Sequence, residues 1–307
     1  MKKIITIAAL SLLLFSCSGK NEKIRIGVLP VIDTLPLLVA DEQGLFKSEG
    51  IDVELVTFNS ALERDAALTS GNLDGAFGDL IAALLQIKNG IDAKIVIESS
   101  HTAKDSRMFA LLASPASKID SIKRIGSNEV AISMGSIIEF FLDRMMLSEN
   151  ADPAKVMRIE VKAIPVRPQM LMTNSLKLAL IPEPLASKAI KDGAVLLADD
   201  TKLDTTATVI MFRESFLESN RESMKKFMAA YSKSVGMINS DPSRFRELMV
   251  KKTRVPEDVR DTFKVPSFDS VKLPSEKDVM LVFDWMKSKG MISGPVDYRN
   301  ITWSLPK

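Results

Sequence analysis

Short apolar runs alternate with longer segments that are apolar on one face through the first hundred residues. The runs predict strands, because they are rich in β-branched residues or alternate in polarity; they cover residues 24–29, 51–58, 73–79 and 93–98. The segments between them predict helices, and the clearest begins at the capping box Ser60 to Glu63 and stops at Gly71. Strands separated by helices of this length pair in parallel through right-handed crossovers.

The alternation continues in a second group of strands and then gives way to a helical tail. The second group covers residues 108–114, 129–133, 156–161, 176–181 and 194–199. After an apolar run at residues 205–212, the pattern predicts helices over residues 221–238, 242–252 and 275–289. Two groups of strands with helices between them predict an α/β fold of two lobes.

The domain organisation follows from where the chain passes between these groups. We expect lobe I to begin with residues 23–105, lobe II to span residues 106–205, and residues 206–307 to return to lobe I with the helical tail. Two strand-like crossings, at residues 100–108 and 203–209, would join the lobes. Two crossings form a two-strand hinge rather than a flexible tether.

Charge and composition exclude several classes of function. The formal net charge of +2 comes from Lys2 and Lys3, so the remaining chain is neutral and has no electrostatic footprint for nucleic acid. With one cysteine and one histidine, His101, the chain cannot form internal disulfides, zinc–thiolate sites or multi-histidine metal sites. We therefore expect no cofactor, no metal and no enzymatic activity, since an enzyme would depend on carboxylates, lysines or a borrowed cofactor.

The single cysteine follows a short apolar run at the start of the chain. Two lysines and an apolar segment over residues 4–15 predict a signal peptide at residues 1–16, too short to remain as a membrane span. The residues up to Cys17 resemble the lipobox of bacterial lipoproteins, which implies a diacylated cysteine, a tether at residues 17–22 and an exported protein held only by lipid at the periplasmic face or cell surface. The alternative is an ordinary signal peptide with an incidental cysteine.

Candidate ligand-binding residues lie where the predicted strands end. Ligands of open α/β sheets bind beyond the carboxyl ends of the strands, and the loops there offer carboxylates, hydroxyls, glycines and a helix start suited to an anion. The candidates are Pro30, Asp33, Thr34, Leu35, Phe77, Gly78, Asp79, Ser99, His101, Gly135, Ser136 and Glu183. Some have a structural alternative, because Thr34, Asp79 and Ser136 could be helix caps and Glu183 could bind backbone.

Three blocks of the sequence resemble a known family. "IRIGVLPVIDTLPLLVADEQGLFKSEGIDVELVTF", "LTSGNLDGAFGD" and "LALIPEPLASKAI" are similar to substrate-binding proteins of bacterial ABC importers, in the branch for nitrate, sulfonates, taurine and thiamine-pyrimidine precursors. The resemblance covers about residues 23–215 and implies the type II periplasmic binding protein fold, a Venus-flytrap of two lobes. It also implies a monomer that binds a small-molecule ligand in the cleft and delivers it to an ABC permease.

The chain departs from this family in ways that leave the ligand class open. Its two tryptophans and two tyrosines all lie in the tail, so Phe77, Phe109 or Phe140 would have to stack against a pyrimidine-class ligand. A sulfonate-class ligand would need cations, and none of the cleft loops contains an arginine. Two other functions remain possible on this fold: an enzyme similar to those of menaquinone biosynthesis, against which the lipobox argues, and a surface interaction lipoprotein with a vestigial cleft.

Overall fold

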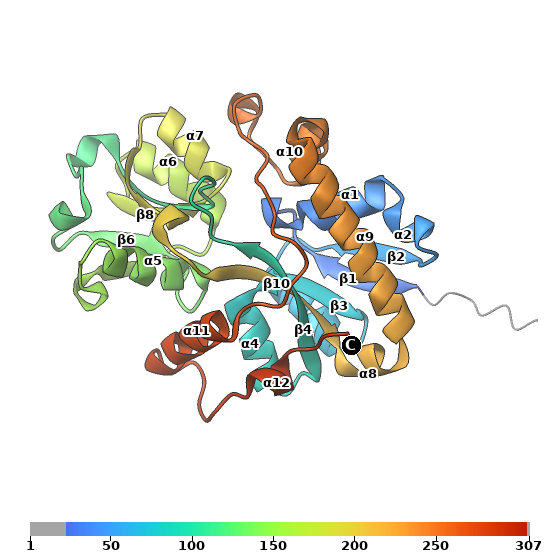
Figure 1. Cartoon of the computed structure of the whole chain (residues 1–307). Helices are drawn as coiled ribbons and strands as arrows, with labels where there is room; N and C mark the ends of the chain where they lie inside the picture. Colours follow the sequence, from blue (N-terminus) through green and yellow to red (C-terminus); the bar gives the residue numbers. More distant parts are fainter. Residues whose placement is uncertain (1–22, 306–307) are drawn as a thin grey trace, which may run out of the picture.

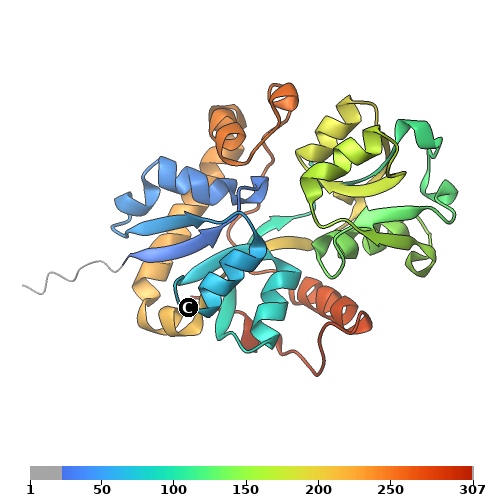
Figure 2. The same cartoon turned by 180° about the vertical axis from the view of Figure 1, so that it is seen from behind.

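The strands form two five-stranded sheets, one in each of two lobes (Figure 1 and Figure 2). The structure is a computed structural model that describes residues 23–305. The first sheet, in the order β2-β1-β3-β10-β4, contains β1 (Ile24–Val28), β2 (Val53–Thr57), β3 (Gly75–Asp79), β4 (Ala93–His101) and β10 (Thr206–Arg213). The second, in the order β7-β6-β8-β5-β9, contains β5 (Phe109–Ala113), β6 (Glu129–Ile132), β7 (Met157–Glu160), β8 (Leu178–Pro182) and β9 (Val195–Asp199). The prediction of two α/β lobes is confirmed.

Helices cover both sheets and form the tail. The first lobe contains α1 (Leu35–Glu42), α2 (Leu45–Ser48), α3 (Ala61–Thr69) and α4 (Leu80–Lys88), and the second contains α5 (Ile137–Ser148), α6 (Arg167–Met172) and α7 (Leu185–Lys191). The tail contains α8 (Glu214–Ser219), α9 (Arg221–Ser240), α10 (Arg246–Lys252), α11 (Glu276–Ser288) and α12 (Tyr298–Ile301). Short 3₁₀ helices are η1 (Ile32–Thr34), η2 (Pro115–Ser117), η3 (Ile122–Arg124), η4 (Pro153–Lys155), η5 (Ile164–Val166), η6 (Asp200–Lys202), η7 (Pro242–Phe245) and η8 (Glu257–Val259).

Strand direction differs from the prediction at the strands that receive the chain from the other lobe. β1 pairs in parallel with β2 and β3, and β6 pairs in parallel with β7 and β8, as the helical crossovers predict. By contrast, β10 is antiparallel to both β3 and β4, and β5 is antiparallel to β8 and β9. The reason is that β5 and β10 each follow a crossing between lobes instead of a helix on the same sheet.

The two segments that connect the lobes are bound to each other and to the second lobe. We name them the first crossing (residues 102–108) and the second crossing (residues 200–205). The Thr102 N–H donates to the Thr205 carbonyl at 3.0 Å, and the Thr205 N–H donates to the Thr102 hydroxyl at 3.1 Å. At the end of the crossings nearer the second lobe, Asp200 Oδ1 accepts hydrogen bonds from the N–H groups of Met108 and Phe109, where the first crossing enters β5. The crossings therefore form a paired hinge.

The tail packs on the first lobe and also reaches the second. α9 lies against α1 and α2, with the rings of Phe46 and Phe227 stacked at 5.5 Å. α11 packs beside α4, and its Trp285 indole N–H donates to Asp143 of α5 at 2.9 Å. On another part of the second lobe, Lys188 of α7 pairs with Asp258 of η8 at 2.8 Å. One large apolar cluster accordingly runs from the first lobe through α11 into the second.

The described residues contain no helix long and apolar enough to cross a membrane. The predicted signal peptide, Cys17 and the tether fall on residues 1–22, which lie outside the described part of the chain.

We predict that Asp143→Ala lowers the free energy of unfolding by about 2 kcal/mol, because the buried carboxylate binds two cations and the Trp285 indole, while Glu139 remains to pair with both cations. Asp143 is buried and also pairs with Arg158 at 2.5 Å and with Lys289 at 2.9 Å. Denaturant unfolding measures the change. The control is Asp120→Ala, which breaks the solvent-exposed pair with Arg124 and should cost less than about 1 kcal/mol. Equal effects of the two substitutions would contradict this account.

Candidate functional site

A buried arginine in each lobe supports a strand whose carboxyl end faces the space between the lobes. Arg64 of α3 donates to the Phe77 carbonyl at 2.7 Å, and Arg167 of α6 donates to the Leu180 carbonyl at 2.8 Å. Burial lowers the pKa of Arg167 to about 10. A Cβ at Gly78 would lie 3.1 Å from the Arg64 guanidinium. Gly78 therefore allows the backbone to approach Arg64 of the same lobe, rather than a ligand.

Asp33, in η1 directly after β1, is a buried carboxylate with one oxygen lacking a partner. Oδ2 accepts a hydrogen bond from Ser100 Oγ at 3.1 Å, while Oδ1 is buried without a hydrogen bond. Burial raises the pKa of Asp33 to about 6, against the opposing effect of hydrogen bonds from Ser100 and Thr208. Within residues 23–305, Asp33 forms no ion pair with a basic side chain. A buried charge is normally paired, so among these residues Asp33 lacks the counter-charge that such a group usually has.

Asp33 lines a cavity of about 250 Å³ against the hinge. The walls come from η1, from the end of β4 with the first crossing, and from the tail segment that runs in front of the crossings in Figure 1. The lining residues are Asp33, Ser100, His101, Thr102, Ala103, Ser106, Met108, Pro266, Ser267, Phe268 and Asp269. Hydroxyls and apolar groups thus alternate around a small polar space, and of the predicted site residues it contains Asp33 and His101.

Most of the other predicted residues of the first lobe have structural contacts. Leu35 and Phe77 are buried in its core, and Thr34 is buried with its hydroxyl donating to a backbone carbonyl at 2.6 Å. Asp79 caps α4 by accepting from a backbone N–H at 2.8 Å, and burial raises its pKa. The Ser99 hydroxyl lies 3.1 Å from the Tyr231 hydroxyl of α9. Their side chains do not line the cavity.

The predicted anion site at the start of α5 is filled by groups of the chain itself. Gly135 has a left-handed backbone (φ +66°), and its N–H donates to Glu139 Oε2 at 2.7 Å. The preceding N–H donates to Glu160 at 2.9 Å, and the Ser136 hydroxyl accepts the N–H two residues later at 3.2 Å. Ser136 is therefore a helix cap, and the neighbouring N–H donors already have carboxylate partners.

Glu183, at the end of β8, is paired with an arginine that the sequence pattern did not reveal. Its Oε1 accepts from Arg107 Nε at 2.7 Å, and its Oε2 accepts from the Ser187 N–H of α7 at 2.9 Å. Arg107 belongs to the first crossing rather than to a strand-end loop, so a search of loops after strands misses it. Pro30, by contrast, is half-buried and has no role in this network.

The aromatic residues that could hold a planar ligand differ from those expected. Phe109 and Phe140 are buried, with Phe140 packed edge-on against Trp285 at 5.5 Å. Phe77 is buried as well. The aromatic ring that lines the cavity is Phe268, which the sequence reasoning missed because the tail returns to the hinge only in the folded chain.

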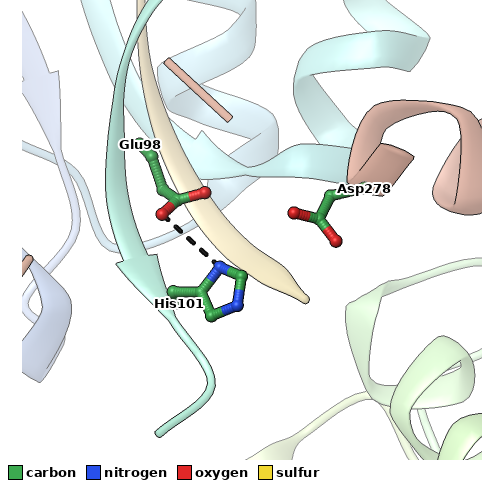
Figure 3. A group of neighbouring side chains, drawn as sticks. All are labelled: Glu98, His101 and Asp278. Carbon is green, nitrogen blue, oxygen red and sulfur yellow. Dashed lines mark ion pairs between the residues drawn. The ribbon is translucent and has the colours of Figure 1, made fainter. Parts of the chain in front are cut away.

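Glu98, His101 and Asp278 are the described residues whose ligand atoms could gather around a metal ion (Figure 3). Figure 3 shows His101 turned toward Glu98, 3.4 Å away, with Asp278 on the facing helix. The neighbouring Glu98 carboxylate raises the pKa of His101 to about 9, burial opposes this, and Asp204 reinforces it. Lys272 also lies 3.2 Å from Glu98. Since Glu98 and His101 are already paired with Lys272, Asp204 and each other, we interpret the group as an ion-pair network beside the hinge.

We predict that His101→Gln destabilises the protein at pH 6 by about 1–2 kcal/mol, after allowing for solvent screening of a partly exposed pair. The folded-state pKa of about 9 lies above the ordinary value of 6.5, so the stabilisation is complete below pH 6.5 and disappears as pH rises through 9. Unfolding free energies of both proteins from pH 6 to 10 measure this convergence. A constant difference across the range would show that His101 acts without its charge.

We predict that Asp33→Asn stabilises the ligand-free protein at pH 7 by about 2 kcal/mol, because asparagine keeps the shape and removes a buried charge. The folded-state pKa of about 6 exceeds the ordinary 3.8, so the native protein loses stability as pH rises through 6. The two proteins should therefore match near pH 4 and diverge up to pH 7 in denaturant unfolding. If the variant were less stable at pH 7, the unpaired charge could not be the cost inferred here.

Comparison with known proteins agrees with this architecture. A protein of Brachyspira hyodysenteriae named as an ABC transporter periplasmic binding protein is 21% identical over 78% of this chain and 75% of its own. The aliphatic sulphonate binding protein SsuA of Escherichia coli superimposes with a TM-score of 0.79 at 18% identity, covering 93% of each chain. The nitrate-binding protein NrtA of Synechocystis gives 0.63 at 15% identity, over 85% of this chain and 75% of that one.

These structural likenesses show the fold and confirm the resemblance predicted from the sequence. The model of the NMT1-like family matches residues 18–251, which cover most of the chain. Since that match includes both sheets and the hinge, the protein belongs to the NMT1-like family.

Proposed function

We propose that the protein is an extracytoplasmic solute-binding protein that captures a small polar molecule between its lobes and delivers it to an ABC permease. The observation that carries this proposal is the polar cavity at the hinge, whose walls come from the first lobe, the first crossing and the tail. The relative named as a periplasmic binding protein supports it, as do the sulphonate- and nitrate-binding proteins that share the fold. Because these relatives are binding proteins, transport is favoured over an enzyme.

The mechanism requires no chemical step. A ligand stabilises the closed form only if it makes contacts there that the open form lacks. Rotation about the paired crossings would bring Glu183, Arg107 and the Ser136 helix start toward the ligand, while Asp33 holds it from the first lobe. The permease would recognise the closed shape. We include in the proposal a lipid anchor at Cys17, a monomeric state and a sulfonate-, pyrimidine- or similar-class ligand.

We predict that one solute class raises the melting temperature of the chain from residue 18 onward. A thermal-shift panel would contain sulfonates, nitrate, pyrimidines, flavin precursors, amino acids and short dicarboxylates, each with product analysis to detect turnover. A ligand at 100 times its Kd adds about 2.7 kcal/mol, which is enough to see. Small-angle scattering in the presence of the compound that raises the melting temperature would show lobe closure as a smaller radius of gyration.

Two variants place the ligand. Ser267→Trp puts a large side chain at the cavity wall and should abolish the shift, whereas Ser270→Trp lies three residues along the same exposed segment, outside the lining, and should keep it. A hit that survives both substitutions would exclude the hinge cavity as the site. A folded protein that binds nothing in the panel would count against solute binding, and product formation would favour the enzyme.

A further inference from the structure

Three helices that follow strands at the interlobe edge have their N-terminal N–H groups bound by acids of the chain. Asp79 caps α4, Glu139 binds at the start of α5, and Glu183 binds the first turn of α7. Glu160 binds a further N–H just before α5. Backbone N–H groups at a helix start otherwise attract anionic ligands. At each of these three helices one N–H donor is already bound by a fixed carboxylate, whereas α1 and α6 have no side-chain cap.

Three of the nearby cations, Arg107, His101 and Arg64, are likewise bound by groups of the chain. Arg107 is paired with Glu183 at 2.6 Å, and His101 lies between Glu98 and Asp204. The buried Arg64 is bound to the Phe77 carbonyl and to the neighbouring Asp65. An anionic solute would therefore have to displace existing partners from these cations.

Asp33, unlike these donors and cations, lacks a partner of opposite charge within the part of the chain that the structure describes. It is the cavity-lining carboxylate that is buried, it receives hydrogen bonds from neutral hydroxyls, and its Oδ1 has no partner. The remaining carboxylate of the lining, Asp269, is exposed and paired with Lys272 at 2.7 Å. A buried carboxylate oxygen without a donor is a costly arrangement that a ligand's N–H group would relieve.

We propose that the solute carries a protonated nitrogen, an amine or amidine, and that Asp33 binds this group. The inference rests on the proposed function and narrows its ligand class. The cation supplies the hydrogen-bond donor and the charge that Asp33 lacks, while the hydroxyls and Phe268 contact the rest of the molecule. A sulfonate or nitrate group would have to compete with the carboxylates that already bind these cations and the starts of α4, α5 and α7.

The test uses matched compounds that differ only in an ammonium or a hydroxyl group. The pairs are taurine and isethionate, butylamine and 1-butanol, and β-alanine and 3-hydroxypropionate. Binding is measured by thermal shift and calorimetry with the chain from residue 18 onward, beside the broad solute panel. We expect the ammonium member of at least one pair to bind at least tenfold more tightly than its hydroxyl counterpart. Asp33→Asn should lower that affinity at least tenfold.

A control variant with the same change of charge shows whether lost binding is specific to Asp33. The pattern of binding shows whether the ammonium inference or solute binding itself has failed. Asp120→Asn changes the same charge on an exposed site of the second lobe and should leave affinity unchanged. Because Asp33→Asn is expected to be stable, lost binding would not reflect unfolding. Binding of an anion or a hydroxyl compound with equal affinity in wild type and Asp33→Asn would overturn this inference but leave solute binding standing. If no compound of the pairs or of the panel bound to the protein, both the ammonium inference and the proposed solute binding would be rejected.

Discussion

The return of β10 into the middle of the first sheet is the constraint on which the rest of the structure depends. The chain leaves this sheet from β4, builds the whole second lobe, and comes back between β3 and β4. Both crossings must therefore leave the first lobe side by side, where Thr102 and Thr205 bind each other. A paired hinge rotates while keeping its strands in register, and the cavity lies directly against it.

The tail limits how the lobes can move. α11 belongs to the first lobe but binds Asp143 of α5 through Trp285, and η8 binds α7 through Asp258. The α11 contact is apolar and buried, so separating it would expose core surface, whereas the Lys188–Asp258 pair is solvent-exposed and easily broken. A rotation of the lobes in which α5 slides over α11 and the Lys188–Asp258 pair breaks therefore costs less free energy than one that separates α5 from α11.

The cleft combines polar groups held by internal hydrogen bonds with buried acids that keep an unpartnered oxygen, Asp33 at the cavity and Asp200 at the hinge. Glu183 and the residues around Ser136 are held by several internal hydrogen bonds, which fixes their geometry but reduces their freedom to bind a solute. Asp33 receives hydrogen bonds only from neutral hydroxyls, and its buried charge is destabilising while no cation pairs with it. Stability given up at a binding residue is a common feature of functional sites. Specificity for the solute would then depend on Asp33, whose Oδ1 receives no hydrogen bond from residues 23–305 of the protein.

The sequence by itself determined the elements, the two lobes and the placing of Asp33 and His101 at the carboxyl ends of strands, although His101 proved to be the last residue of β4 and Asp33 to lie in η1. Strand and helix periods are local properties, and loops after parallel strands must gather at one edge. The antiparallel direction of β10, the position of Phe268 in the cavity wall and the Arg107–Glu183 pair came only from the tertiary structure. Each joins segments distant along the chain, and no local pattern specifies such a contact. For the same reason, the sequence placed carboxylates at the strand ends, but only the fold decided which were paired and which, at Asp33, was not.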